Sequence, residues 1–265
     1  MGSFDGIQTE RRTARIAGLW YLLLAAGSGY SWFYMAAAYV EGDAAATTAK
    51  ILATGSGYLA SIAGSVVGQV GFLLLALALY RLFRRTSEPQ ARLLASFVMV
   101  SVPIMFANIV FQAGAYALLT RADFLNVFAA SQAKALAMVL VQLHIVGVHI
   151  VEVFWGLWLF PFARLAYRSG LFPRILAVLL AVSGGAYVVG SASYLLVPNA
   201  FAILERYLSL LEAAGEIPML VWLLSVGVKA CRTGAGGPRV PVGVNELCPG
   251  LGEMKRSTRG AGGCS

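Results

Sequence analysis

The chain has 265 residues, of which 59% are hydrophobic and only 12% are charged. Soluble domains carry about 25% charged residues, and a soluble fold could not hide this much apolar surface, whereas lipid can. The net charge of +8 does not indicate a nucleic-acid partner, because the basic residues form no stripe with interleaved aromatic residues. The composition therefore predicts an integral membrane protein, with the lipid bilayer as its main partner.

Six apolar segments follow one another along the chain, each long enough to cross a hydrocarbon core of about 30 Å as a helix. None shows the alternating pattern of a transmembrane strand, so we expect an all-α bundle of six transmembrane helices. The first apolar run exceeds the roughly 7–15 residues of a signal-peptide core, so we interpret it as a retained helix. The predicted spans are residues 16–38, 57–80, 94–118, 138–163, 175–197 and 207–228.

The predicted organisation is a polar N-terminus over residues 1–14, a transmembrane domain over 15–229 and a tail over 230–265. Most basic residues fall on one side of the predicted spans, and the positive-inside rule places that side in the cytoplasm. Both termini are then cytoplasmic, and the protein lies in the cytoplasmic (inner) membrane. The basic residues on the predicted cytoplasmic side are Arg11, Arg12, Arg15, Arg81, Arg84, Arg85, Arg92, Arg164, Arg168, Arg174, Lys229, Arg232 and Arg239, and those on the other side are Lys50, Arg121, Lys134 and Arg206.

The connecting segments carry local signals. Asp43 is placed to cap a short helix in the first outer loop, and residues 121–134 predict a second short helix at the membrane surface. Residues 169–173 have the composition of a turn. The glycine- and proline-rich tail predicts disorder, and its cysteines predict free thiols rather than a disulfide framework or zinc site. These cysteines are Cys231, Cys248 and Cys264.

Small residues are expected to mediate helix packing, since lipid provides no hydrophobic drive for helices to associate. The segment around Gly64 and Gly68 has the Gly-x-x-x-Gly spacing, which predicts close packing within the chain, with a homodimer through such faces as the alternative. Pro103 and Pro218 lie inside predicted spans and predict kinks.

Polar groups inside spans are costly and usually face a bundle interior. On a helix His149 and Glu152 lie about 60° apart and share a face, whereas His144 points about 140° away from His149. His149-x-x-Glu152 has the spacing of di-iron carboxylate bundles, but the second such motif that they need is absent. We therefore expect no metal and no other cofactor. The candidate ligand-binding residues are His144, Glu216, Gln69, Gln112, His149 and Glu152.

Glu216 lies deeper in its predicted span than Glu212 and shortly before Pro218. Two interpretations stay open: a structural hydrogen bond to His144, Gln69 or Gln112, or a role in a ligand site or proton pathway. Glu212 shares its helix face but lies nearer the outer end. No Gly-x-Ser-x-Gly elbow, phosphate loop or dinucleotide fingerprint occurs, so we assign no catalytic residue.

Several stretches resemble a family of bacterial membrane proteins catalogued as domain of unknown function 4386. The resemblance covers about residues 11–229 and implies a six-helix membrane protein without an established activity, so it brings no catalytic residues to this chain. The stretches are Arg12-Thr13-Ala14-Arg15-Ile16-Ala17-Gly18-Leu19, Gly42-Asp43-Ala44-Ala45-Ala46-Thr47, Gln142-Leu143-His144, Phe154-Trp155-Gly156-Leu157-Trp158-Leu159, Tyr167-Arg168-Ser169-Gly170-Leu171-Phe172-Pro173-Arg174-Ile175-Leu176, Glu216-Ile217-Pro218 and Leu220-Val221-Trp222-Leu223-Leu224.

The sequence thus favours a non-enzymatic binder or carrier of a small molecule or lipid, with a polar pocket inside the membrane around His144 and Glu216. An intramembrane enzyme that acts on a lipid or quinone is the alternative, with the same pair as acid and base. A structural or partner-regulating role is the third hypothesis. The absence of a nucleophile or metal motif favours the first over the second.

Overall fold

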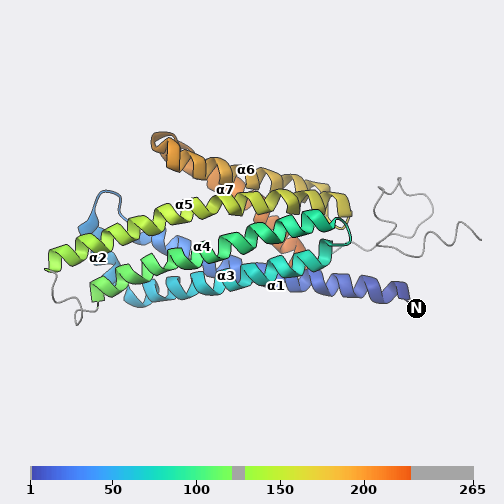
Figure 1. Ribbon diagram of the computed structural model, residues 1–265, viewed down its shortest axis with the longest axis horizontal. Coiled ribbons are helices and arrows are strands. Elements are labelled where there is room, and N and C mark those ends of the chain that lie inside the picture. The colour runs from blue at the N-terminus through green and yellow to red at the C-terminus, as the bar shows by residue number, and fades with distance from the viewer. Residues whose placement is uncertain (1, 121–128, 228–265) are drawn as a thin grey trace, which may run out of the picture.

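The computed structural model describes residues 2–120 and 129–227, with side chains from Glu10 onward. The described chain forms seven α-helices (Figure 1). The predicted disordered tail and its three cysteines lie outside the described residues, as does most of the predicted surface helix of residues 121–134. The helices are α1 (Gly2–Ala38), α2 (Ala44–Ala53), α3 (Gly55–Phe83), α4 (Glu88–Thr120), α5 (Ala130–Ser169), α6 (Arg174–Leu196) and α7 (Pro198–Ser225).

Five helices, α3 to α7, are long and apolar enough to cross a membrane, with mean hydropathies between 1.4 and 2.2 over their most apolar stretches. Their outward faces carry large apolar side chains such as Ile175, Val178 and Val189 on α6, as expected for surfaces that face lipid. The apolar run of α1 is not among the five. It contains Trp20, Tyr21, Tyr30 and Trp32 as well as glycine and serine, and these residues are less hydropathic than the leucine and valine of the other helices.

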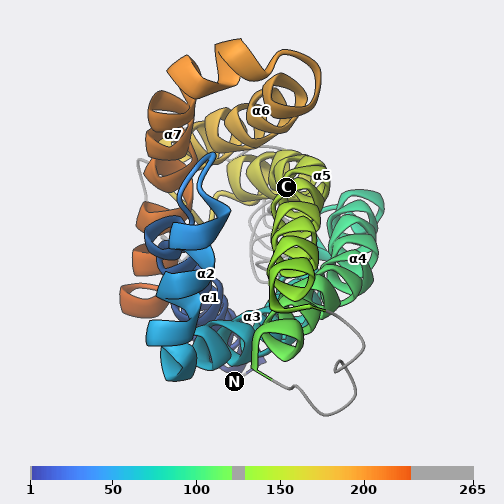
Figure 2. The same ribbon diagram turned by 90° about the vertical axis from the view of Figure 1, so that its left-hand side faces the viewer.

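The long helices form a closed ring. Each of α3, α4, α5 and α6 packs against the next helix in the chain, α1 packs against α3, and α7 returns to contact α1. Viewed from one end, the helices surround a common axis, with the short α2 lying over the end where α1 finishes (Figure 2). Because α1 bridges α3 and α7, side chains from both halves of the chain meet inside the ring.

Glycines let α1 and α3 approach closely, as the small-residue pattern predicted. A Cβ atom added to Gly64 would lie 2.8 Å from the carbonyl oxygen of Gly27, and one added to Gly71 would lie 3.1 Å from the backbone nitrogen of Leu24. A similar approach occurs between α5 and α6, where a Cβ on Gly184 would lie 2.9 Å from the Gly156 carbonyl oxygen. These glycines are therefore used for packing inside the chain.

Aromatic side chains fill the end of the bundle near the α3–α4 and α5–α6 turns. Trp158, on α5, is 1% exposed and contacts Tyr21 of α1 and Phe72 of α3 edge-to-face, with ring centroids 6.2 and 5.1 Å apart. Phe83 and Phe162 meet one layer further along, with centroids 5.9 Å apart. This packing fixes α1, α3 and α5 relative to one another.

The helix boundaries depart from the predicted spans where amphipathic turns extend them. α5 begins at Ala130, where the Gln132 side chain accepts a hydrogen bond of 2.9 Å from the Ala129 backbone. α7 begins at Pro198, a residue suited to a first helical turn. The predicted cap of α2 is confirmed, because Asp43 Oδ1 accepts a hydrogen bond of 2.8 Å from the Ala46 backbone. The predicted turn before α6 is confirmed as well, with Gly170 at a φ of +67°.

Proline occurs inside three helices. Pro103 and Pro218 lie within α4 and α7 as the sequence indicated, and Pro161 lies within α5. α5 and α7 continue as single helices through these positions. The kinks expected at Pro103 and Pro218 stay predictions.

Candidate functional site

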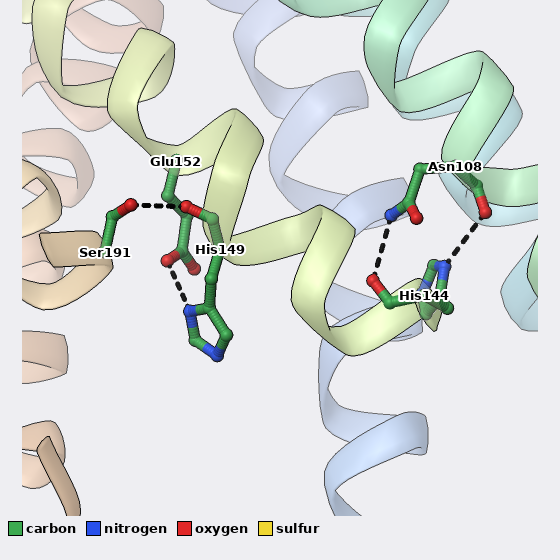
Figure 3. Close-up of polar contacts among 5 residues, drawn as sticks. All are labelled: Asn108, His144, His149, Glu152 and Ser191. Carbon is green, nitrogen blue, oxygen red and sulfur yellow. Dashed lines mark hydrogen bonds and ion pairs between the residues drawn. The ribbon is translucent and has the colours of Figure 1, made fainter. Parts of the chain in front are cut away.

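His149 and Glu152 form a hydrogen-bonded pair on one face of α5, as their spacing predicted. His149 Nδ1 lies 2.7 Å from Glu152 Oε2 (Figure 3). The His149 ring stacks on Tyr194 of α6, with centroids 3.7 Å apart. Ser191, also on α6, donates a hydrogen bond of 2.5 Å to the His149 carbonyl oxygen. These contacts hold the pair against α6.

A small pocket opens beside this pair, between α1, α5, α6 and α7. Its free volume is about 30 Å³. A cavity needs roughly 10–15 Å³ by the same measure to hold one water, so the space suits one or two groups of that size. The residues that line it are Trp32, His149, Glu152, Gly190, Phe201, Glu205, Leu208, Ser209 and Glu212.

The pocket lining is acidic. Glu152, Glu205 and Glu212 belong to the lining, and the described lining contains no lysine or arginine. Among the described residues, the Glu212 carboxyl group forms no ion pair and no hydrogen bond. The backbone carbonyl oxygen of Glu212 accepts a hydrogen bond of 2.9 Å from Ser183. The Glu212 side chain is therefore available to a ligand.

Small residues of α6 make room for α7 at this point. Ser183 donates to the backbone oxygens of both Leu211 and Glu212, at 2.8 and 2.9 Å. A Cβ on Gly190 would lie 3.7 Å from Glu212 Oε1, so the carboxyl group of Glu212 extends across α6 where a glycine leaves space. The α6–α7 pairing thus directs Glu212 into the pocket.

Glu216 lies one helical turn after Glu212 on α7 and is partly buried. Its two carboxyl oxygens each accept a hydrogen bond of 2.7 Å, from the hydroxyl groups of Tyr21 on α1 and Tyr187 on α6. Three helices are therefore joined at one carboxyl group. The spacing of four residues places Glu212 and Glu216 on the same face of α7.

His144 lies on the opposite face of α5 and serves the contact with α4. The amide of Asn108 donates to the His144 carbonyl oxygen at 3.0 Å, and His144 Nδ1 lies 3.3 Å from the Asn108 carbonyl oxygen (Figure 3). His144 is 4% exposed and Asn108 is 3% exposed. This reciprocal pair fixes the α4–α5 interface.

The two candidate glutamines lie in the ring interior. The Gln112 side-chain amide donates to Ser61 of α3 at 2.9 Å, and the Gln112 backbone carbonyl oxygen accepts a hydrogen bond from Tyr58 at 3.0 Å. Gln69 is 1% exposed, and its Oε1 has no hydrogen-bond partner within the described part of the chain. Gln112 therefore acts in packing between α3 and α4.

The structure does not bring His144 and Glu216 together. Glu216 bonds to Tyr187, whose ring contacts Trp155 of α5 with centroids 6.4 Å apart. Trp155 follows His144 by eleven residues, which corresponds to about 16 Å along a helix. The small pocket lined by His149, Glu152 and Glu212 includes neither His144 nor Glu216, and a ligand site around those two residues stays a prediction.

Glu212 was not a candidate residue, because its position near the end of a predicted span suggested contact with water. The tyrosine partners of Glu216 were not predicted, because membrane-protein tyrosines are common at interfaces and in packing. The four-residue spacing of Glu212 and Glu216 was the available signal. No group of three or more histidine, cysteine or acidic side chains that could hold a metal occurs among the described residues.

Residues 16–227 match the model of a family described as "Domain of unknown function (DUF4386)". No curated protein and no solved structure matches the chain.

Proposed function

The chain belongs to the domain of unknown function 4386 family, and from this premise we propose that it is a multi-pass membrane protein that binds or carries a small protonated primary amine. The observation that supports this proposal is the acidic pocket between α1, α5, α6 and α7. It replaces the broader expectation of a small-molecule or lipid ligand with a defined chemical class.

The charge of the pocket favours a cation. Three glutamates belong to the pocket lining, and the lining contains no lysine or arginine. An anion would be repelled by the carboxyl groups, whereas a cation would be attracted by them. A cation in this space would be attracted by all three carboxyl groups and would relieve their mutual repulsion.

The size of the pocket favours a primary ammonium group. About 30 Å³ of free volume accommodates a group the size of a water molecule, and an ammonium group is a compact charge with three donors. A short apolar substituent on the amine would contact Trp32 and Phe201 in the lining. Aromatic faces also attract cations.

The remaining candidate residues then have supporting roles. Glu216, through Tyr21 and Tyr187, holds α7 one turn from the ligand, while His144 and Gln112 hold the interfaces of α4. In this proposal the ligand contacts Glu212, Glu152 and His149.

We place this protein in the cytoplasmic membrane with six spans, α1 being the sixth. Arg85 acts electrostatically on Glu10, and Gly227 at the end of α7 packs against the Arg11 carbonyl oxygen. The basic segments therefore gather at one end of the bundle, and the positive-inside rule supports a cytoplasmic location for that end. A cysteine at Lys134 should react with an impermeant thiol reagent in intact cells, whereas one at Arg84 should not.

The thermal unfolding of the protein in lipid nanodiscs tests amine binding. Ethylamine at 100 times its dissociation constant should stabilise the protein by about 2.7 kcal/mol, and ethanol at equal concentration should have no effect. The stabilisation should disappear in Glu212→Gln and persist in Glu41→Gln, which changes an exposed carboxyl group. Equal stabilisation of both variants would refute the proposed site.

The hydrogen-bonded pair of His149 and Glu152 supports an enzymatic alternative. A histidine held 2.7 Å from a carboxyl group is an arrangement suited to general base catalysis, here on a lipid or quinone. This alternative predicts turnover that is lost in His149→Gln. Amine binding by the native protein, without turnover of any membrane extract component, would favour the binder.

A homodimer remains a second proposal about assembly. The α1–α3 and α5–α6 glycines are occupied within the chain, whereas Gly29 and Gly185 have no atoms of other residues within 4 Å of an added Cβ. These two positions are the small-residue faces available to a second copy.

A further inference from the structure

A groove runs along the outer surface between the second half of α5 and the first half of α6. Its free volume is about 290 Å³. The floor consists of alanines, of which Ala163 and Ala177 are 5% and 3% exposed, whereas the flanking Phe160, Tyr167 and Val178 are between 41% and 51% exposed. The groove thus exists because small residues lie between large ones.

The groove faces lipid. Within the described chain α6 has its principal helix contacts with α5 and α7, and its outward face carries the exposed residues Ile175, Val178, Val182 and Val189. A groove of this size lies at the lower limit of small-molecule sites, which span about 300–1,000 Å³. It can therefore take one apolar chain rather than a whole lipid.

One end of the groove is positively charged. Arg164 belongs to its lining, and Arg168 lies one turn further along α5. Arg174 at the start of α6 has its guanidinium carbon 5.3 Å from the centre of the Tyr167 ring. The segment of residues 153–204 contains no aspartate or glutamate, and none of these arginines has an ion pair among the described residues.

We propose that this groove is a binding site for an anionic phospholipid, with one acyl chain between α5 and α6 and the phosphate at Arg164 and Arg174. Arginine binds phosphate through paired hydrogen bonds, and basic sites between transmembrane helices are suited to anionic head groups. The arginines lie at one end of the apolar groove. A single lipid could therefore place its acyl chain in the groove and its phosphate at the arginines. This site is separate from the acidic pocket, whose lining shares no residue with it.

Native mass spectrometry of the whole chain in detergent tests the proposal, with phosphatidylglycerol and phosphatidylcholine of equal chain length as probes. The native protein should retain phosphatidylglycerol more strongly. Arg164→Gln should weaken that binding about fivefold, which corresponds to about 1 kcal/mol for one basic residue at a membrane surface. Arg84→Gln removes the same charge from another exposed position and should leave binding within about twofold.

A pair of phenylalanine variants tests the apolar part of the groove. Ala181→Phe should fill part of the groove and reduce retention of phosphatidylglycerol, whereas Val189→Phe, on the same outward face but outside the lining, should not. Inorganic phosphate should not displace the lipid. Equal losses in Arg164→Gln and Arg84→Gln, unchanged binding in a folded Ala181→Phe, or displacement by phosphate would each overturn the proposal.

Discussion

The contact between α1 and α3 offers a sharp test of the helix arrangement, through two glycine-to-alanine changes with opposite expected signs. In Gly64→Ala the new Cβ would lie 2.8 Å from the Gly27 carbonyl oxygen, whereas in Gly29→Ala the new Cβ has no neighbour within 4 Å. The obstructing atom at Gly64 is backbone, so a side-chain rotation cannot relieve the overlap.

The change in the free energy of unfolding can be estimated for each variant from the presence or absence of this overlap. Overpacking costs about 1–3 kcal/mol, and replacing glycine inside a helix gains about 0.5–1 kcal/mol. Gly64→Ala should therefore destabilise the protein by up to about 2.5 kcal/mol. Gly29→Ala should stabilise it by up to about 1 kcal/mol, because only the helix gain applies.

Equilibrium unfolding in mixed micelles with increasing sodium dodecyl sulfate, followed by tryptophan fluorescence, measures both changes. Gly27→Ala alters the facing glycine, so its effect should be less than additive with that of Gly64→Ala. Stabilisation by Gly64→Ala, or equal destabilisation by Gly64→Ala and Gly29→Ala, would refute this packing of α1 on α3.

Three further predictions concern other contacts. Asn108→Ala removes the hydrogen bond from the Asn108 side-chain amide to the His144 carbonyl oxygen. It should lower the free energy of unfolding by about 0.6–1.7 kcal/mol, as measured for hydrogen bonds between transmembrane helices. The same unfolding assay checks this, and no change would contradict a packing role for His144. Asp43→Ala removes the cap of α2 and should cost about 1 kcal/mol of local helix stability, seen as faster amide exchange in residues 44–48 but not in α6. Burial raises the pKa of Glu10 and the Arg85 charge opposes that rise, so Arg85→Gln should raise the Glu10 pKa further. A carboxyl pKa that is raised in the folded state favours folding only at low pH. Arg85→Gln should therefore lose more stability than the native protein as the pH rises through the Glu10 pKa. A carbon-13 titration of Glu10 in this variant checks the shift, and an unchanged or lower Glu10 pKa would contradict the contact between Glu10 and Arg85.

The secondary structure was largely predictable, because each long helix is a run of apolar residues bounded by turn or cap signals such as Asp43 and Gly170. α1 was harder to classify, since the tyrosines and tryptophans that join it to the other helices also lower its hydropathy. The lengths of the helices were less predictable, since the first turns of α5 and α7 extend beyond the apolar runs.

The site was predictable only within single helices. The shared face of His149 and Glu152 follows from helical spacing, and so does the opposite orientation of His144. Which helices lie beside those faces depends on the ring order and on the depth of each residue along its neighbours. For that reason the expected partners of Glu216 were His144, Gln69 or Gln112, whereas the tertiary packing supplies Tyr21 and Tyr187.

The binding of radiolabelled methylamine to the protein in lipid nanodiscs, measured by scintillation proximity, tests the acidic pocket most directly. The proposal predicts saturable binding of one amine per chain, competition by unlabelled ethylamine but not by ethanol, and loss of binding in Glu212→Gln but not in Glu41→Gln. Absence of saturable binding to the native protein, or undiminished binding to Glu212→Gln, would contradict it.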